Sequence, residues 1–526
     1  YQSMIYGFVF LPLCLAAYQI APQRWRKRVL LIFSWIFFWL LSRGLIVYLL
    51  GTTVFVHCIG IWLEWLKSEQ KAELGTAGKG EKKKIKAIYQ KKSRYVLAFG
   101  VLALLGILAY LKYYNFFVSN VNGIFGSVLP FTLAEKKILM PIGISFYTLQ
   151  AIGYMADVYW GKIRAEENLE KTALFLAFFP QIMEGPICRY QDTADALCEG
   201  RPLDTDNLTK GYIRIFWGLF KKRIIADRLA IAVGMIFDNY TSYSGAYIAV
   251  GAVAYTVQLY MEFSGSMDII IGSGELFGVR LPENFRQPFC ARSAAEFWRR
   301  WHITLGTWFK TYIFYPVSMS SPVKKWNQYS RKRLGKYAAM LGTSAIALFP
   351  VWMCNGLWHG ARWSYIFYGM YYFTLILLGI AVEPVRDRIL EFLYIGEKSA
   401  GLRLMRIAKT WVIIFVGELF FRADGLRAGV HMFRSMFDHF DLSIFTDGSL
   451  LNLGMSRADI IAVMAGCVVV AVVGSIKERG TDIRQSILQK PVVIRWGICY
   501  ALMLAVIIIS AYGDGYQVID MIYAGF

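Results

Sequence analysis

The sequence predicts an all-α integral membrane protein. The chain has 526 residues, 56% of them hydrophobic, and its mean hydropathy is +0.43. Soluble domains are about 45–50% apolar, so this composition favours a bilayer. A helix needs about 20 apolar residues to cross a bilayer. Apolar runs of about that length recur at residues 4–20, 44–65, 95–111 and 365–382, and at 460–473 and 496–509 when the flanks of these two are included.

The basic residues between these runs order the first predicted spans. Residues 24–28 contain four cations, and residues 67–94 contain ten Lys or Arg against three Glu. Short loops rich in Lys and Arg stay cytoplasmic, so two spans, at 29–42 and 44–66, are expected between them. The amino terminus is then expected outside. The run at 4–20 has no basic stretch before it, which argues against a cleaved signal peptide.

The rest of the chain continues the same pattern, for a total of about eleven to fourteen membrane helices. No soluble domain is expected. Residues 1–526 are predicted to form one polytopic domain, with N-terminal helices (1–113), a core (114–385) and C-terminal helices (386–526). The later spans are expected near residues 95–113, 137–157, 171–188, 211–237, 246–278, 337–354, 363–382, 403–423, 457–475 and 494–512. The main loops are expected at residues 114–135, 189–210 and 431–456.

The charge and the cysteines exclude two classes of protein. The net charge is +21, and residues 318–336 contain six Lys or Arg and no acid. Because these cations lie between apolar runs, they are expected to face membrane lipids, and no nucleic-acid partner is expected. The eight cysteines lack Cys-x-x-Cys spacing. No disulfide framework, zinc site or other metal site is therefore predicted.

The segment from Arg280 to Pro316 is too polar for an ordinary lipid-facing span. Ser293 and Glu296 form a capping-box pattern, which predicts a helix from about residue 294. Glu296 and Arg300 are four apart and can pair on one face. If this helix continues to residue 312, His302 falls on its aromatic side. Such a helix is expected to lie at the interface or to re-enter the membrane against other helices.

A second histidine, His359, follows a predicted span that contains Pro350. Proline inside a helix removes a backbone hydrogen bond and kinks the helix. Gly356 and Gly360 flank His359, so that backbone or substrate can approach closely. Asn355 adds a hydrogen-bonding group. Polar groups at membrane depth are costly and indicate function by default, so His302 and His359 are the candidate reaction centre.

Several stretches of this chain resemble the membrane-bound O-acyltransferase family, in the bacterial branch of alginate O-acetylation and teichoic-acid D-alanyl transfer. The resemblance covers about residues 5–440, and the motifs occur in family order. They are Pro141–Phe146 with Tyr154–Tyr159, Phe179–Gln181 with Gly185–Ile187, Phe263–Gly265 and Asp268 with Leu281–Phe285, Phe297–His302, Gly356–Gly360 and Phe420–Asp424.

The resemblance implies a multi-helix fold around a central tunnel and an acyl transfer across the bacterial plasma membrane. The family's two histidines correspond to His302 and His359. Many relatives have a further His-Gly after the next span, but here residues 369–373 read Gly-Met-Tyr-Tyr-Phe, so that Tyr372 is the remaining hydrogen-bonding candidate. No bound cofactor is expected. The donor would be acetyl-CoA or another acyl thioester, which an acyl carrier protein can also present.

Histidine suits general-base catalysis because its unperturbed pKa lies near 6.5. His359 is therefore predicted to activate the acceptor hydroxyl and His302 to act on the donor carbonyl, although the two roles can be exchanged. Asn355 could hold the oxyanion. Several supporting candidates also have a structural alternative: phosphate binding or interfacial anchoring for Arg299 and Arg300, ligand contact or packing for Trp298, Trp301 and Trp308, and proton relay or buried pairing for Asp268. Trp358, next to His359, is a further supporting candidate.

The predicted function is transfer of an acyl group, most simply acetyl, to an extracellular polysaccharide or to a secreted partner transferase. Phe420–Asp424 and the chain length favour the alginate-type branch. The enzymatic alternative is D-alanylation of teichoic acid. A transporter or channel is the alternative from another class, which explains the helices but not the motifs, and no internal repeat supports it.

Overall fold

The structure is a computed structural model that describes residues 1, 3, 5–126 and 132–512. Every regular element within these ranges is helical, which confirms the predicted all-α class. Six stretches are long and apolar enough to cross a membrane: Gln23–Thr76, Lys82–Phe125, Gly335–His359, Trp363–Ala381, Arg457–Glu478 and Val492–Ile509. The larger number of spans expected from the sequence stays a prediction.

The described chain divides into two compact units. One contains Tyr1–Gly211 with Ile270–Pro282, and the other contains Tyr212–Ile269 with Glu283–Phe526. The boundary falls within two helices, α8 (Thr205–Leu219) and α10 (Gly245–Leu276). The first unit also contains α1 (Leu11–Ile20), α2 (Gln23–Ser42), α3 (Ile46–Thr76), α4 (Lys82–Phe125), α5 (Ile144–Trp160), α6 (Leu169–Ala177) and α7 (Tyr190–Glu199).

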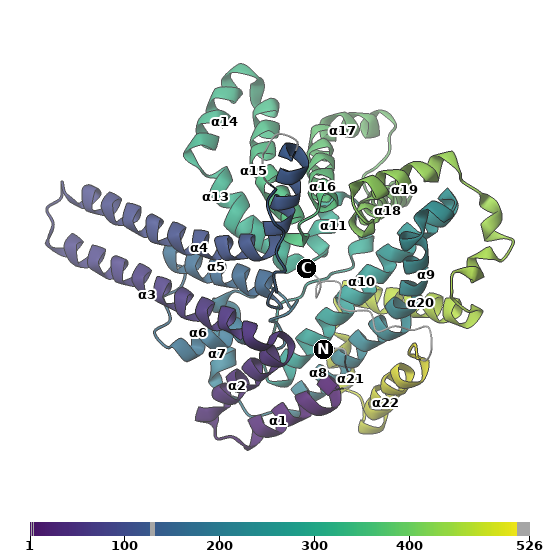
Figure 1. The fold of residues 1–526 in the computed structure, drawn as a ribbon, viewed down its shortest axis with the longest axis horizontal. Helices are drawn as coiled ribbons and strands as arrows, with labels where there is room; N and C mark the ends of the chain where they lie inside the picture. The colour runs from purple at the N-terminus through teal and green to yellow at the C-terminus, as the bar shows by residue number, and fades with distance from the viewer. Residues whose placement is uncertain (2, 4, 127–131, 513–526) are drawn as a thin grey trace. The chain divides into compact units, whose positions relative to one another are not determined.

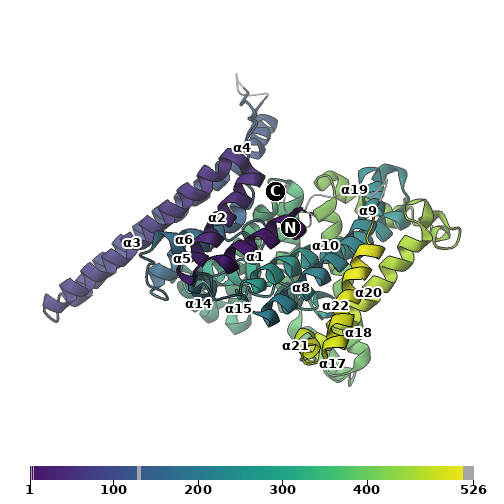
Figure 2. The same ribbon diagram turned by 90° about the horizontal axis from the view of Figure 1, so that it is seen from below.

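Helices α3 and α4 form a long antiparallel hairpin whose turn lies clear of the other helices of this unit (Figures 1 and 2). The basic segment 67–94, expected as a loop, is mostly helix, because α3 continues to Thr76 and α4 begins at Lys82. The Tyr89 hydroxyl donates to Glu73 Oε1 at 2.6 Å and ties the two helices together beyond their apolar parts. Lysine has good helix propensity, so the concentration of positive charge in residues 67–94 was no reason to expect an irregular loop there.

Helix α5 forms the core of the first unit, and residues 144–158 are all buried. It begins after Gly143, whose φ is +70°, and a Cβ at Gly143 would lie 2.0 Å from the Ile182 carbonyl oxygen. Only glycine allows this conformation at so close a contact. The approaching chain is the turn after α6, which corrects the span expected at 171–188: α6 ends at Ala177 and a buried irregular segment follows.

The polar groups of that buried segment form hydrogen bonds with side chains and carbonyl groups of the surrounding protein, and not the regular bonds of a helix. The Phe179 amide donates to Ser34 Oγ at 3.1 Å, and the Gln181 side chain donates to the Phe175 carbonyl at 2.7 Å. Irregular backbone at membrane depth is tolerated where protein covers it. Two of the expected loops also contain helix, because α7 lies within residues 189–210 and α4 continues to Phe125.

The second unit contains the candidate histidines. Its helices are α9 (Asp227–Asp238), α11 (Ala294–Arg300), α12 (Ile303–Phe309), α13 (Tyr315–Ser318), α14 (Ser321–Arg333), α15 (Gly335–His359), α16 (Trp363–Ala381), α17 (Glu383–Phe392), α18 (Ala400–Arg422), α19 (Leu426–Asp438), α20 (Arg457–Glu478), α21 (Ile483–Leu488) and α22 (Val492–Ile509). Helix α14 occupies the second basic segment, and α19 begins before the loop expected at 431–456 and extends into it.

The C-terminal helices of this unit are tied to its middle by a buried arginine. Ser456 and Asp459 form a full capping box at the start of α20. Asp459 also accepts from Arg228 Nε at 2.8 Å, and the same guanidinium donates to the Ile509 carbonyl at 2.6 Å. Arg228 therefore joins α9, α20 and the end of α22.

Candidate active site

The helix predicted through residues 294–312 is broken at His302. Ser293 caps α11 as expected, since its hydroxyl accepts from the Glu296 amide at 3.1 Å. The helix then ends at Arg300, and His302, with φ of +45°, becomes the N-cap of α12. A non-glycine residue in this left-handed region costs about 1–3 kcal/mol, so the surroundings must hold it. The continuous helix was a wrong prediction, because propensity does not register such tertiary contacts.

Asn284 holds this break. Its carbonyl accepts from the Ile303 amide at 3.0 Å, and its Oδ1 accepts from the Thr304 amide and hydroxyl at 3.0 and 2.9 Å. Asn284 is 1% exposed, so these bonds are shielded from water. The conformation at His302 is thus imposed by Leu281–Phe285, one of the motifs found in the sequence.

The same asparagine selects the tautomer of His302. The imidazole Nδ1 lies 3.3 Å from Asn284 Oδ1. Because that atom also accepts from Thr304, it is the amide oxygen, and Nδ1 must carry the hydrogen in a neutral ring. Nε2 is then the basic nitrogen. The Phe263 ring, edge-on at 4.9 Å between centroids, fixes the plane of the imidazole.

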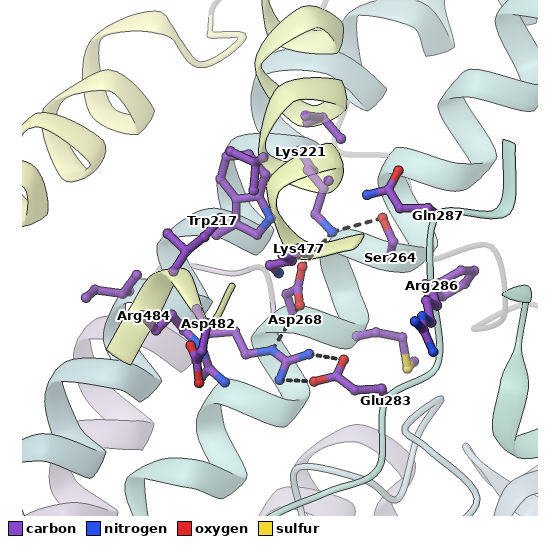
Figure 3. Close-up of a pocket in the computed structure, with 18 of the residues that line it drawn as sticks. Trp217, Lys221, Ser264, Asp268, Glu283, Arg286, Gln287, Lys477, Asp482 and Arg484 are labelled. Atoms are coloured by element: carbon purple, nitrogen blue, oxygen red, sulfur yellow. Dashed lines mark hydrogen bonds and ion pairs between the residues drawn. The ribbon is translucent and has the colours of Figure 1, made fainter. Parts of the chain in front are cut away.

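A cavity of about 560 Å³ lies next to this break, inside the second unit (Figure 3). Asn284 and Ile303 line it, whereas neither imidazole is among the lining residues in the described part of the chain. The central tunnel that the family resemblance implies therefore stays a prediction. The wall is made by α8, the π-helical segment Phe220–Ala226, α10, residues 283–287 and the helices α20 to α22.

Asp268 is at the centre of an ion-pair cluster in this wall. It binds Lys221 Nζ at 2.6 Å and Arg214 Nε at 2.9 Å, and Arg214 in turn pairs with Glu283. Lys221 also donates to Ser264 at 2.9 Å, as Figure 3 shows. Of the two alternatives for Asp268, these contacts favour buried pairing. Lys221 belongs to a π-helical turn, a feature common at functional sites.

The C-terminal helices contribute charged side chains to the cavity that the sequence analysis did not single out. Lys477 and Glu478 come from the end of α20, and Asp482 and Arg484 follow it. Their signal in the sequence is a cluster of charges directly after an apolar run. Arg300 does not line the cavity; its guanidinium binds Glu296 at 3.0 Å and Glu478 at 2.9 Å.

The remaining candidates in α11 and directly after it differ in burial. Arg299 is exposed and does not line the cavity. Trp301 is 4% exposed and packs between Phe285 and Phe297, at 5.1 and 5.3 Å between ring centroids. Trp298 packs against Tyr372 at 4.9 Å. For both tryptophans the contacts favour packing over ligand stacking.

His359 is the last residue of α15, which continues through Pro350, and it is 3% exposed. Gly356 lets α16 approach, because a Cβ there would lie 2.4 Å from the Tyr365 carbonyl oxygen. Asn355 lies one turn before His359 on the same helix and is also buried. A close approach of backbone or substrate was expected at Gly356, and the structure shows that the backbone of α16 makes it.

Aromatic rings enclose the imidazole of His359. Phe421 lies edge-on at 5.0 Å, Trp358 at 5.1 Å and Tyr368 at 5.8 Å between centroids. Trp358 is also 5.5 Å from the His302 ring. One indole therefore contacts both histidines, which the structure brings together although they are 57 positions apart in the sequence.

Tyr372 lies behind this aromatic group. It is fully buried and packs against Trp298, Trp352 and Tyr368. The Tyr368 hydroxyl donates to Glu418 of α18 at 2.9 Å. Sequence analysis missed Glu418, although a single carboxylate inside the apolar stretch 411–421 is a recognisable signal.

Comparison with known proteins gives a consistent set of relatives. A model of the membrane-bound O-acyltransferase family matches residues 166–389, which include both histidines. The "Probable alginate O-acetylase AlgI" of Pseudomonas syringae pv. tomato is 34% identical over 474 residues, 90% of this chain and 80% of the relative. The "Peptidoglycan O-acetyltransferase" of Helicobacter pylori is 30% identical over 65% of this chain and 64% of its own. The "Teichoic acid D-alanyltransferase" of Bacillus subtilis is 27% identical over 52% and 71%.

Proposed function

The chain belongs to the membrane-bound O-acyltransferase family, and we propose that it moves an acetyl group from a cytoplasmic thioester across the membrane to a hydroxyl outside. The acceptor is an extracellular polysaccharide or a secreted partner transferase. The protein is an acyltransferase of the membrane, like its relatives. The acetyl group is favoured because the relatives that cover most of this chain are named O-acetylases.

The observation that carries the proposal is the single indole of Trp358 between two buried histidines, at 5.5 Å from His302 and 5.1 Å from His359. In the proposed reaction His359 removes the proton of the acceptor hydroxyl, and the oxygen attacks the thioester carbonyl. The C–S bond then breaks, and the leaving thiolate takes the proton. A positioned general base contributes roughly 10²–10⁴ in rate.

His302 is proposed to act on the donor. Its hydrogen bond to Asn284 leaves Nε2 as a hydrogen-bond acceptor, which can hold the thiol that forms once the leaving thiolate has taken its proton. The exchange of roles between the two histidines remains an alternative. Asn355, one turn before His359, is proposed to donate its amide N–H to the oxyanion, which is worth a few kcal/mol.

The cavity beside His302 is proposed to admit the donor. Its volume of about 560 Å³ is within the range of small-molecule sites. Arg286, Lys477 and Arg484 line it, and such cations suit the phosphates of coenzyme A or of a carrier's prosthetic arm. Because rings enclose His359, we propose that the acceptor reaches it when the ring of Phe421 moves.

The proposed location is the plasma membrane of a bacterium, with an extracytoplasmic amino terminus. The support is the basic end of the α3–α4 hairpin, since Lys and Arg concentrate on the cytoplasmic side. A maleimide reagent that cannot cross membranes should then label Gly78→Cys, made in a chain whose eight native cysteines are replaced by serine, only in inverted vesicles. Labelling in intact cells would show the opposite orientation, with the amino terminus in the cytoplasm.

Two donors separate the proposal from its enzymatic alternative. The protein in lipid nanodiscs is incubated with radiolabelled acetyl-CoA or with a D-alanyl carrier protein, each with a polysaccharide hydroxyl acceptor. We expect acetyl transfer from acetyl-CoA. Transfer from the D-alanyl carrier alone would instead support the teichoic-acid function, for which the relatives cover about half of this chain.

A further inference from the structure

Glu418 is a buried carboxyl that the proposed chemistry does not use. It lies in α18 and is 1% exposed. One of its oxygens accepts from the Tyr368 hydroxyl at 2.9 Å, and the other accepts no hydrogen bond from any described residue. Glu418 makes no ion pair within the described part of the chain. A buried carboxyl is costly unless it is hydrogen-bonded, so the bond from Tyr368 is its main compensation.

Tyr368 connects this carboxyl to His359. Its ring is edge-on to the imidazole, at 5.8 Å between centroids and 86° between planes. The ring is 2% exposed and is bounded on its other sides by Phe421 and Tyr372, both at 5.0 Å. The hydrogen bond to Glu418 therefore fixes the hydroxyl end of Tyr368, and the rings of Phe421 and Tyr372 limit sideways movement of its ring.

Helix α18 therefore reaches the imidazole by two routes. Phe421 touches it directly, edge-on at 5.0 Å, and Glu418 reaches it through Tyr368. Glu418 and Phe421 are three residues apart, so they lie on one face of the helix. The two contacts hold neighbouring sides of the aromatic enclosure.

We propose that Glu418 is a positioning residue for His359, acting through the hydroxyl of Tyr368. The inference rests on the proposed role of His359 in acyl transfer. It predicts that the essential property of Glu418 is an oxygen that accepts from Tyr368, and not its negative charge. A glutamine keeps that oxygen at the same place, whereas a leucine of similar size does not.

The test uses full-length protein in nanodiscs and measures kcat and KM for acetyl-CoA. Tyr368→Phe removes only the hydroxyl, and Glu418→Leu removes only the acceptor. Both are expected to lower kcat about tenfold, with KM for the donor unchanged, and the double variant should lose no more than the worse single one. Glu418→Gln should stay within about twofold of the wild-type kcat.

Tyr371→Phe is the matched control. Tyr371 also joins α16 to α18, because its hydroxyl donates to the Ile413 carbonyl at 2.9 Å, but its ring makes no ring contact with His359 among the described residues. Its kcat should not change. If Glu418→Leu fails to fold, Tyr368→Phe carries the test alone.

Three outcomes would overturn the inference: wild-type kcat in Tyr368→Phe, additive losses in the double variant, or a loss in Glu418→Gln as large as in Glu418→Leu. His359→Ala is measured in parallel. If it is fully active, the proposed role of His359 fails; if it is inactive while Tyr368→Phe is normal, only the positioning role fails.

Discussion

His302 and His359 share one tryptophan but are held in different ways. His302 lies at a broken helix, where the polar side chain of Asn284 fixes both backbone and ring, next to a charged cavity. His359 ends an intact helix and is enclosed by aromatic rings, with one polar link through Tyr368 to Glu418. The first arrangement fixes a tautomer, and the second fixes a ring position while keeping water out.

This difference suits the two proposed roles. A group that meets a charged thioester donor needs a polar approach and a defined nitrogen, which the His302 side provides. A base that must activate a hydroxyl without hydrolysing the donor benefits from a dry enclosure. Variants that change either the surroundings of His302 or those of His359, but not both, can therefore separate the two roles.

The largest expected effect is on the cavity side. Asp268→Ala leaves Lys221 and Arg214 buried without their shared carboxylate. Breaking a buried ion pair in this way costs about 3–5 kcal/mol. The measurement is thermal unfolding in detergent. Asp238→Ala, which removes a pair with Arg422 that is largely exposed, is the control and should cost less than about 1 kcal/mol. Equal unfolding temperatures for the two variants would contradict the buried cluster.

A packing change tests the His359 side. Gly356→Ala places a methyl group 2.4 Å from the Tyr365 carbonyl oxygen, so α15 and α16 must separate. Overpacking of this kind costs about 1–3 kcal/mol, and activity should fall with it. Gly379→Ala on α16 meets no atom within 4 Å and should be neutral. A fully active and stable Gly356→Ala protein would show that the helices are not in such close contact.

Asn284→Ala tests the His302 side. It removes the side-chain oxygen that accepts from Thr304 and contacts the imidazole, and leaves the Thr304 amide buried without that partner. The expected loss of stability is about 1–3 kcal/mol, with a larger fall in kcat than the Gly356 variant shows at matched stability. Asn327→Ala is the control, because Asn327 is exposed. An unchanged kcat would show that the helix break at His302 does not affect the rate of acyl transfer.

The smallest effect is expected at the cavity wall. Lys477→Gln removes one exposed cation of the lining, so KM for acetyl-CoA should rise about threefold and kcat should remain, as is typical of exposed charges. Lys490→Gln serves as the control because it is also exposed and does not line the cavity. A fall in kcat without a change in KM would argue against donor binding there.

The sequence predicted the membrane class, because hydropathy carries that information. Its local motifs singled out His302 and His359, whose catalytic role stays a prediction. It also predicted the caps at Ser293 and the pairing of Glu296 with Arg300, which are local contacts. It missed the break at His302, because that conformation depends on Asn284, eighteen residues earlier in the chain. It missed Lys477 and Glu418 for the same reason: their positions depend on contacts between segments far apart in the chain. Hydrophobic periodicity identifies a helix, but it does not show which distant helix a charged residue on it will face.

The central claim is that both histidines take part in acyl transfer. Single-turnover transfer from radiolabelled acetyl-CoA, measured in nanodiscs for His302→Ala and His359→Ala, tests it most directly. Each variant is expected to lose roughly 10²–10⁴ in rate, while His439→Ala, an exposed histidine, keeps the wild-type rate. Full activity in either buried-site variant, at normal expression and unfolding temperature, would contradict the account.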